Sequence, residues 1–308
     1  MSGAAGLLAG YTADVLLGDP PRWHPVAGLG RTAAAVERIS YAPTRPRGVA
    51  YAGGLVALSA LAAELAARRF GRTPVLAAVT WAALGGRSLS RAALAIAEHL
   101  ERGDLQRARA GLPTLVGRDP SALDEAGVCR AVVESVAENT GDAVVGALLW
   151  GVVAGPAGVA AYRMANTLDA MVGHRSDRYE RFGWASARLD DALGWPSARL
   201  AAALAALCAP TVGGSPRRAW TALRRHGAAH PSPNAGRLEA TFAGALGVRL
   251  GGTLTYSGRV EHRPFLGDGP APTSNDVRRA VRLSRAVGLL AAVGLAAVCR
   301  TRVVGGGR

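Results

Sequence analysis

The stretch Glu134–Arg163, ESVAENTGDAVVGALLWGVVAGPAGVAAYR, holds the charged and apolar features that decide the fold. Three carboxylates, Glu134, Glu138 and Asp142, fall close together at its start, and residues 143–162 carry no formal charge. A straight helix needs about 20 apolar residues to cross a bilayer. The uncharged run therefore predicts a membrane span that begins beside a group of acids.

Further uncharged runs predict more than one span. They fall at residues 48–63, 73–86, 200–216 and 286–299. We expect an all-α, polytopic helical membrane protein with about four to six apolar segments. The alternative is a soluble, alanine-rich helical protein that uses these runs as its core. Residues 1–308 are expected to form one membrane domain, with polar, site-forming loops at 98–142, 163–199 and 214–285 and a short hairpin over Thr253 to Phe265 that turns at Ser257–Gly258.

Composition narrows the chemistry. The hydrophobic fraction is 49% and the mean hydropathy is +0.16, with aromatic residues at only 5%. Small apolar residues suit close helix packing in membranes, whereas few aromatics argue against a nucleic-acid stacking surface. All 36 basic residues are arginine, so lysine Schiff bases and lysine-containing phosphate loops are excluded. Any phosphate must be bound by arginine and metal.

The uncharged run is interrupted by Gly155-Pro156, which leaves two possibilities open. The run could be a plain span, which would separate Asp142 from Arg163 by one membrane thickness. It could instead break into half-helices of about 11 and 7 residues that form a re-entrant hairpin. A hairpin would return Arg163 to the side of Asp142.

Two motifs have the residue types of a metal and phosphate site. On a helix, Glu134, Glu138 and Asp142 recur at i, i+4 and i+8, which predicts a carboxylate face able to bind Mg²⁺; a solvated acidic face is the alternative. The next motif places Arg163, Asn166 and Asp169 at helical spacing. Arg178, Arg181 and Arg188 follow it, and then the pair Asp190-Asp191. Such mixtures serve phosphoryl chemistry, and an interfacial ion-pair network would explain them as well.

The histidines are weaker candidates. His226 and His230 have i, i+4 spacing, which could bind zinc from one helix, although Gly227 and Pro231 disfavour a helix there. His24 stands alone in the proline-rich stretch GDPPRWHPV. A structural role and a catalytic one are both open for it.

Read in order, five motifs resemble one family. They are LLGDPPRWHPVAGLGR, VVESVAENTGDAVV, YRMANTLDAMVGHRSDRYERFGWASARLDD, HPSPNAGRLEATFAGALGVRLGG and RPFLGDG. Together they resemble the adenosylcobinamide-phosphate synthase family (CobD/CbiB), membrane proteins of cobalamin biosynthesis. The resemblance covers nearly the whole chain. It departs from the family pattern at His174, where an aromatic is expected, and at Arg237, where tryptophan is common.

The resemblance implies an ATP-dependent ligase of the inner membrane. Adenosylcobyric acid would be joined to (R)-1-amino-2-propanol or its O-phosphate, with ATP and Mg²⁺ as cofactors. The expected partners are these substrates, membrane lipid and other cobalamin-assembly enzymes, and no nucleic acid. A non-catalytic scaffold of corrinoid assembly and a small-solute transporter are the alternatives.

From their chemistry we expect the following roles in such a site. The metal ligands would be Glu134, Glu138, Asp142, Asp169 and Asp190. Substrate and phosphate would be bound by Arg163, Asn166, Arg178, Arg188 and Asn234. The catalytic residues would be His24, Glu138, Asn139 and His230, with a histidine as the base.

Overall fold

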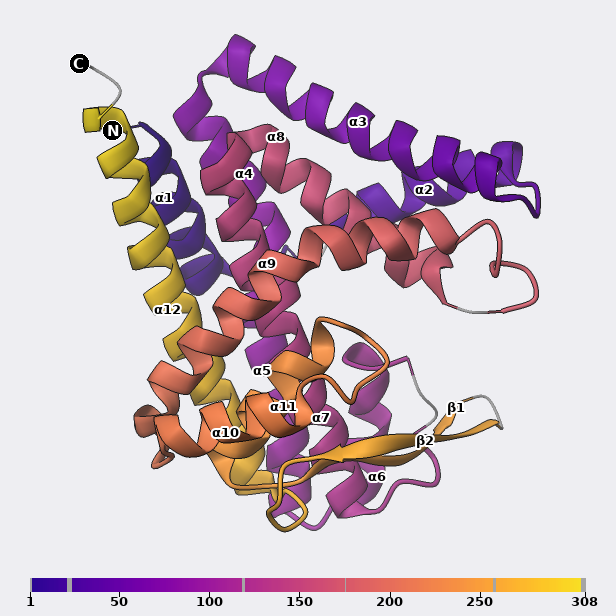
Figure 1. Ribbon diagram of the computed structural model, residues 1–308, viewed down its shortest axis with the longest axis vertical. Helices are drawn as coiled ribbons and strands as arrows, with labels where there is room; N and C mark the ends of the chain where they lie inside the picture. The colour runs from indigo at the N-terminus through magenta and orange to yellow at the C-terminus, as the bar shows by residue number, and fades with distance from the viewer. Residues whose placement is uncertain (1, 21–23, 118–119, 175, 257–258, 306–308) are drawn as a thin grey trace. The chain divides into compact units, whose positions relative to one another are not determined.

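The computed structural model describes residues 2–20, 24–117, 120–174, 176–256 and 259–305, and most of these are helical (Figure 1). The helices are α1 (Ser2–Leu17), α2 (Pro25–Ser40), α3 (Arg45–Phe70), α4 (Arg72–Leu84), α5 (Gly86–Glu101), α6 (Leu105–Gly111), α7 (Glu125–Asn139), α8 (Gly146–Leu168), α9 (Trp184–Cys208), α10 (Pro216–His226), α11 (Ala235–Leu246) and α12 (Ser274–Gly305). Short helical turns are η1 (Leu112–Thr114), η2 (Thr140–Val145), η3 (Asp169–Gly173) and η4 (Ala209–Val212), and the strands are β1 (Leu250–Tyr256) and β2 (Arg259–Leu266). The predicted helical fold is confirmed.

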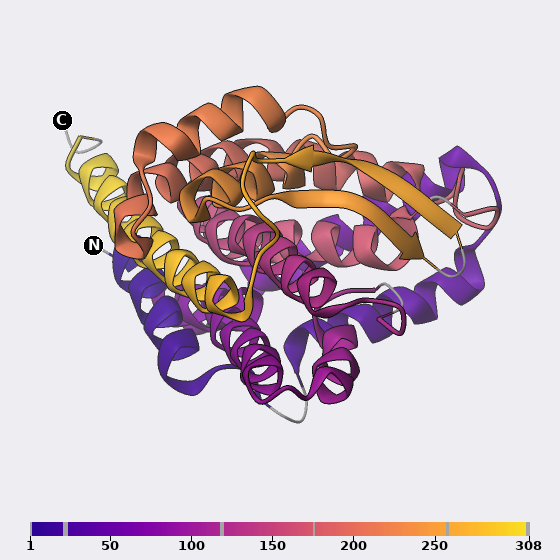
Figure 2. The same cartoon turned by 90° about the horizontal axis from the view of Figure 1, so that it is seen from below.

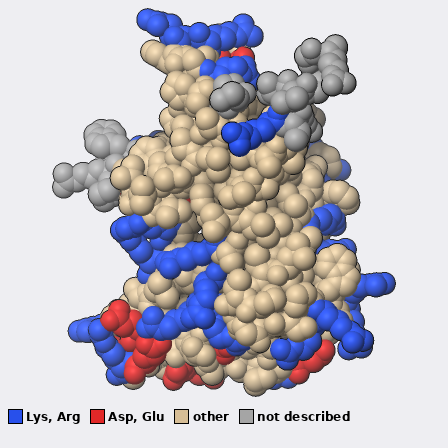
Figure 3. All heavy atoms as spheres, turned by 90° about the vertical axis from the view of Figure 1, so that its left-hand side faces the viewer, with Lys and Arg blue, Asp and Glu red and all other residues tan. Residues whose placement is uncertain are grey.

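Four helical segments among the described residues are long and apolar enough to cross a membrane. They are Arg45–Phe70, Glu125–Gly173, Trp184–Val212 and Ser274–Arg300. On α3, Leu58, Leu61 and Leu65 are each more than half exposed. Exposure of such apolar side chains to water costs free energy, whereas contact with lipid tails does not. Figure 3 shows one face of the molecule, on which wide areas carry no charged side chain. The chain is therefore a polytopic helical membrane protein, within the predicted range of apolar segments.

The chain divides into two compact units, each built from segments far apart in sequence. Unit 1 consists of Met1–Arg87, Asp142–Ser197 and Ala291–Arg308, and unit 2 consists of Ser88–Gly141 and Ala198–Leu290. The expectation of one domain stays a prediction. The division matters for function because the predicted site residues fall into both units.

Unit 1 is held together by helices with small contact residues. α1 packs along α4, and α3 and α4 pack against α8. Gly10 of α1 lies against the carbonyl of Ala77 and the side chain of Thr80 in α4, so a larger residue there would separate the two helices. This is the small-residue packing that the composition predicts.

α8 is broken at Gly155 and folds back on itself. Gly155 has φ 63° and ψ −144°, a conformation that glycine adopts readily, and Pro156 starts the second half. Gly146 lies directly against the ring of Tyr162, and Gly158 lies against the carbonyl of Trp150. These contacts pair residues on opposite sides of the break, so of the two possibilities that the sequence leaves open the structure shows the hairpin. Its halves, 146–154 and 156–168, differ in length from those expected.

Unit 2 contains the small sheet. β1 and β2 pair antiparallel with an irregular register between Leu250 and Gly252. The strand pair contacts α7 and α11, and Figure 2 shows the two strands as the golden arrows running over these helices. The predicted hairpin over Thr253 to Phe265 is confirmed, and its expected turn at Ser257–Gly258 lies outside the described residues.

Candidate functional site

The two chemistry-bearing motifs each end in a π-helical turn. η2 follows the acids of α7 and includes Asp142, and η3 follows α8 and begins at Asp169. A π-helix closes i→i+5 hydrogen bonds, and such turns are frequent at functional sites. The wider turn also breaks the i, i+4 spacing of an α-helix. The sequence, read with one helical period throughout, could not show this change.

The predicted carboxylate face is therefore not regular. Glu134 is buried and Glu138 is exposed, although both belong to α7. Asp142 follows in η2, where the α-helical register ends. Asn139 donates to the carbonyl of Ser135 at 2.9 Å, within its own helix. Glu134 and Glu138 thus keep their i, i+4 spacing in α7, and the prediction is corrected for Asp142, which the π-helical turn takes out of that register.

Glu134 has a structural partner. Its Oε1 accepts a hydrogen bond of 2.8 Å from the backbone N–H of Gly251, at the irregular start of β1. Gly251 has φ 77°, and a Cβ there would overlap the carbonyl of Pro264. The buried carboxylate therefore fixes the strand pair to α7. If Glu134 also binds a metal, it must do so while its Oε1 keeps this hydrogen bond.

No three His, Cys, Asp or Glu side chains of the described residues are grouped so that they could hold a metal ion. The five predicted ligands are Glu134, Glu138, Asp142, Asp169 and Asp190, and they do not form one ready cage. Mg²⁺ often uses only one or two carboxylates, several waters and the phosphates of a substrate. The residues present fit that mode, and the magnesium assignment stays a prediction.

The hairpin of α8 brings polar residues together in unit 1. Arg163 donates to Asn166 Oδ1 at 3.0 Å, and Asn166 Nδ2 donates to Asp190 Oδ1 at 3.4 Å. Arg163 also lies within electrostatic reach of Asp142 and Asp19. The sequence assigned most of these residues to the site but could not show that they meet around one guanidinium. With His24, which contacts Asp19, these six residues form what we call the unit 1 polar cluster.

Asp169 is turned toward the end of its own π-helical turn. Its carboxylate covers Gly173 so closely that a Cβ at Gly173 would overlap it. Its neighbours include the side chains of His174 and Asp191. The structure thus gives Asp169 surroundings different from those of Arg163 and Asn166, with which it shares a motif.

Two histidines, each followed by a proline, are held in two separate turns of the same kind. His24 Nδ1 accepts from the N–H of Val26 at 3.1 Å, and His230 Nδ1 accepts from the N–H of Ser232 at 3.0 Å. Each Nε2 faces a carboxylate, Asp19 at 3.4 Å for His24 and Glu239 at 3.8 Å for His230.

These contacts restrict what either histidine can do. A neutral imidazole has one N–H, so a ring whose Nδ1 accepts carries its proton on Nε2. In this tautomer His24 turns its Nε2–H toward Asp19. The Nε2 of His230 lies 3.2 Å from Nη1 of Arg263, which can only donate, so Ser232 and Arg263 compete for the one acceptor of a neutral ring. Both nitrogens of each ring thus have neighbours that restrict a role as a free base. The geometry favours a positioning role for both, with His24 also forming the N-cap of α2.

The predicted zinc pair is not formed on one helix. α10 ends at His226, whose Nε2 faces Asp268 at 3.4 Å, whereas His230 lies beyond the helix in its His-Pro turn. Gly227 caps the helix with φ −62° and ψ −18°, and Pro231 lies beyond it in the His-Pro turn.

Two of the predicted phosphate ligands have other surroundings. Arg178 pairs with Glu37 of α2 at 3.0 Å and lies over the Tyr41 ring at 4.2 Å. The hydrogen bond to Glu37 raises the pKa of Arg178. The pKa of Tyr179 is raised chiefly by burial, and its own hydrogen bond to Glu37 adds to the increase. Arg188 is exposed on α9. Arg178 therefore fastens its connection to α2, and Arg188 is not enclosed by the unit 1 polar cluster.

The remaining predicted ligand, Asn234, lies in unit 2. It is buried, and its Oδ1 accepts from Arg199 at 3.3 Å. Near it, Arg263 contacts His230 at 3.2 Å. The sequence missed Arg199, Arg263 and Glu239, because these residues come from segments whose meeting depends on the fold. Together with His230, Asn234 and Arg237 they form what we call the unit 2 polar cluster.

Asp14 was also missed. It is 3% exposed within the apolar helix α1, and its carboxylate accepts backbone N–H groups of Gly85, Gly86 and Arg87. It therefore caps the start of α5. The available signal was a single acid in an otherwise uncharged helix, which is costly to bury unless it has such partners.

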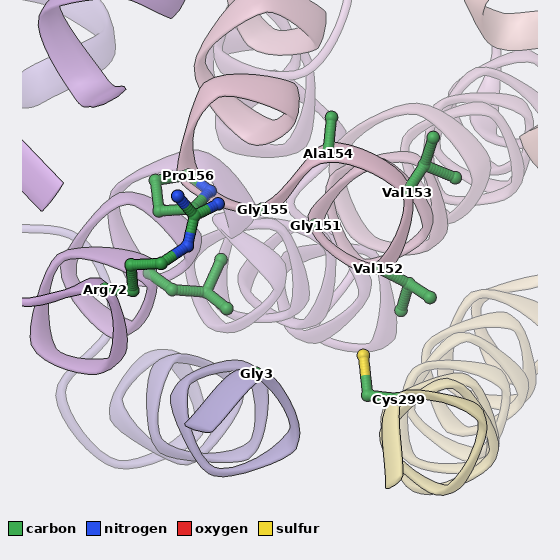
Figure 4. A pocket seen from close by; sticks show the side chains of 10 residues that line it. Gly3, Arg72, Gly151, Val152, Val153, Ala154, Gly155, Pro156 and Cys299 are labelled. Atoms are coloured by element: carbon green, nitrogen blue, oxygen red, sulfur yellow. The ribbon is translucent and has the colours of Figure 1, made fainter. Parts of the chain in front are cut away.

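A cavity of about 300 Å³ lies at the tip of the α8 hairpin in unit 1. It is lined by residues 151–156 together with Gly3, Arg72, Leu76 and Cys299 (Figure 4). Arg72 is its only charged lining residue, and it pairs with Glu64 at 2.9 Å. The cavity thus lies at the opposite end of the hairpin from Asp142 and Arg163 and lacks their mixture of charges.

Comparison with known proteins gives the family. The family model described as CobD/Cbib protein matches residues 7–284. The chain is 53% identical over 293 residues to the "Cobalamin biosynthesis protein CobD" of Mycobacterium tuberculosis (strain ATCC 25618 / H37Rv), covering 94% of each chain. It is 46% identical to the protein of that name from Chromobacterium violaceum, covering 96% of this chain and 97% of the relative, and 40% identical to that of Rhodobacter capsulatus, covering 97% and 98%. No solved structure matches the chain. By this extent of similarity, the chain belongs to the CobD/CbiB family.

Proposed function

We propose that this protein is an ATP-dependent ligase of cobalamin biosynthesis in the inner membrane. It joins the free propionate of adenosylcobyric acid to (R)-1-amino-2-propanol or its O-phosphate and gives adenosylcobinamide or its phosphate. Its similarity to relatives named for cobalamin biosynthesis supports the pathway. The observation that carries the proposal is the unit 1 polar cluster, where the α8 hairpin places Arg163 within electrostatic reach of Asp142.

In the proposed reaction the propionate oxygen attacks the γ-phosphorus of ATP, and the bond to the β-phosphate oxygen breaks. This gives an acyl phosphate and ADP. The amine nitrogen then attacks the acyl carbon, loses a proton and expels inorganic phosphate, so the amide forms with one ATP consumed. Such a reaction needs stabilisation of the transferring phosphoryl group and a group that accepts the amine proton.

The chain's own residues can be assigned to these needs. Arg163 stabilises the charge on the phosphoryl oxygens, because its guanidinium is held by Asn166 and lies among carboxylates. Asp142 and Asp190 would hold Mg²⁺, which when bound neutralises polyphosphate charge. Asp19, oriented by the Nε2–H of His24, takes the proton from the amine. Glu138 lies in unit 2, and its expected roles as metal ligand and catalytic residue stay predictions from the sequence.

The proposal is tested with the purified full-length chain in detergent. ATP, Mg²⁺, adenosylcobyric acid and each amine in turn are supplied, and the corrinoid product and ADP are measured together. One ADP per amide supports the ligase. Absence of product with either amine overturns it and favours a scaffold that needs other enzymes. Uptake of a solute into vesicles without ADP formation would favour a transporter.

A further inference from the structure

The outward face of α10 in unit 2 is strongly basic. Four arginines of this helix are exposed, namely Arg217, Arg218, Arg224 and Arg225. Trp220 lies among them and is 47% exposed. Residues 192–238 contain no Asp or Glu, so the segment around α10 supplies no acid of its own to balance these charges. Such a surface is expected to attract an anionic partner.

Asp268 offsets part of this charge at the end of the helix. Its carboxylate faces Arg225 at 3.9 Å and His226 at 3.4 Å, both in the last turn of α10. At about 100° per residue, Arg217 and Arg224 lie within about 20° of each other on the helix surface, and Arg225 is about 100° away from Arg224. The acid therefore lies at the edge of the basic face, and the pair Arg217 and Arg224 occupies its centre.

The opposite face of α10 is packed within unit 2. Ala219, Ala222 and Leu223 are buried. Gly244 of α11 lies so close to Ala222 that a Cβ at Gly244 would overlap the alanine side chain. An amphipathic helix on a membrane surface usually inserts its apolar face into the bilayer. Because α11 covers the apolar face of α10, contact with another molecule must be made by the basic face.

α10 begins where two candidate membrane spans meet. The segment Trp184–Val212 ends just before it, and residues 213–215 lead into the helix. Arg279, near the start of the candidate span Ser274–Arg300, donates to the carbonyl of Val212 at 3.0 Å. The end of one span and the start of the other therefore lie together in unit 2. α10 contacts η4 at this end of α9 (Figure 1), so it starts at the expected membrane surface.

The residue types of the basic face suit a phospholipid surface. Arginine binds phosphate strongly, and its long stem lets the guanidinium group reach the headgroups. Tryptophan is enriched at the boundary between headgroups and acyl chains because its ring is amphipathic. By the same helical geometry, Trp220 lies about 40° from Arg224, on the side away from Arg225. The face thus passes from an indole ring to a row of guanidinium groups, as expected of a helix at a bilayer surface.

We propose that the exposed face of α10 binds the headgroups of anionic phospholipids, with Arg217 and Arg224 on lipid phosphate and Trp220 at the level of the glycerol. The partner is a lipid rather than a soluble anion, because the helix starts where two membrane spans meet and carries an exposed indole ring. A cluster of basic residues directly after a span is a known sequence pattern for such binding. The contact fixes α10 and α11 at the membrane surface and does not depend on the proposed reaction.

Lipid binding is measured on the purified full-length chain in detergent by native mass spectrometry, with phosphatidylglycerol and phosphatidylcholine titrated separately. We expect phosphatidylglycerol to bind the wild-type chain more tightly. One basic residue near an anionic membrane surface strengthens binding by about fivefold. Arg217→Gln/Arg224→Gln should therefore weaken phosphatidylglycerol binding by about fivefold or more and leave phosphatidylcholine binding unchanged.

The matched control is Arg217→Lys/Arg224→Lys, which keeps both charges and should keep the preference for phosphatidylglycerol. Both side chains are exposed, so neither double variant should change the thermal midpoint measured without added lipid. Equal phosphatidylglycerol affinity in the wild type and the glutamine variant overturns the proposal. An equal loss in the lysine variant also overturns it, because charge would then not be what holds the lipid.

Trp220 gives an independent measurement in vesicles. Phosphatidylcholine that is brominated near the top of its acyl chains quenches tryptophans at the membrane interface. The fluorescence lost to bromine should be smaller in Trp220→Phe than in the wild type, because one quenched indole has been removed. An unchanged loss would show that Trp220 lies away from the bilayer and would overturn the proposal.

Discussion

The ring of Tyr162 fills the space that a side chain at Gly146 would need, so the two halves of α8 touch where they approach the polar edge of unit 1. This contact and the break at Gly155 set the position of Arg163, the residue after Tyr162. The chemistry proposed for Arg163 therefore depends on a glycine that bears no functional group.

Gly146→Ala should destabilise the protein and lower product formation, because its methyl group would overlap Tyr162. Overpacking of this kind typically costs about 1–3 kcal/mol. Gly54→Ala on α3 is the matched control, since a Cβ there meets nothing within 4 Å. Thermal unfolding in detergent should show a lower midpoint for Gly146→Ala and an equal or higher one for Gly54→Ala. Equal midpoints for the two variants would contradict the hairpin contact.

The hairpin also predicts membrane topology. Asp142→Cys and Ala170→Cys, each in a background without the native cysteines, should react with an impermeant maleimide added to the same side of sealed vesicles. Both positions belong to unit 1, and Ala170 is exposed. Each half of α8 is too short to cross the bilayer, since a helix rises about 1.5 Å per residue and the apolar core is about 30 Å thick. Labelling from opposite sides would show a plain span instead.

Arg163 and Arg188 should differ in importance although both belong to one motif. Arg163→Gln is expected to lower kcat by about a hundredfold or more, the usual effect of removing one donor to a transition-state charge. Arg188→Gln should change kcat little, because Arg188 is exposed on α9. Steady-state kinetics on both variants measures the two kcat values. A large loss for Arg188→Gln with a small one for Arg163→Gln would move the phosphoryl site to the outer face of α9.

The sequence predicts the helical membrane fold well because long uncharged runs can be read without knowledge of contacts. It also predicts the hairpin as one of two possibilities, since Gly155-Pro156 is a local signal. It cannot predict that η2 and η3 are π-helical, because that depends on how the flanking helices pack. The same limit applies to Glu134: its partner is a backbone N–H at Gly251, far along the chain.

The histidines show a subtler limit. The sequence shows His24-Pro25 and His230-Pro231, but only the structure shows that Nδ1 in each ring accepts from the N–H two residues later. A residue type suited to acid–base chemistry is used here to fix a turn. Asn234 and Arg163 were expected in one set of phosphate ligands, and the structure places them in different units.

His24→Asn should keep part of the activity if His24 positions Asp19, because asparagine retains the cap but lacks the Nε2–H that faces Asp19. Asparagine is a good N-cap residue and can accept the N–H of Val26, so α2 should still begin correctly. His24→Ala lacks the cap and should lower the free energy of unfolding by about 1 kcal/mol. The pH dependence of kcat should keep its shape in His24→Asn if Asp19 takes the proton. Equal loss of kcat in both variants, with the acidic limb of the profile abolished, would identify His24 as the base.

The variants Glu134→Gln and Glu138→Gln test which of the two glutamates is the metal ligand. Glutamine keeps an oxygen that can accept the N–H of Gly251, so Glu134→Gln should fold and retain activity if Glu134 serves to fix β1. Glu138 is exposed, and its replacement by glutamine removes a charge while nearly keeping the size of the side chain. We expect Glu138→Gln to abolish synthesis while the protein remains in the membrane. The two variants are compared by activity over a range of Mg²⁺ concentrations. A higher Mg²⁺ requirement in Glu134→Gln, with none in Glu138→Gln, would show that the buried carboxylate is the ligand, and that its contact with the sheet places the metal within unit 2.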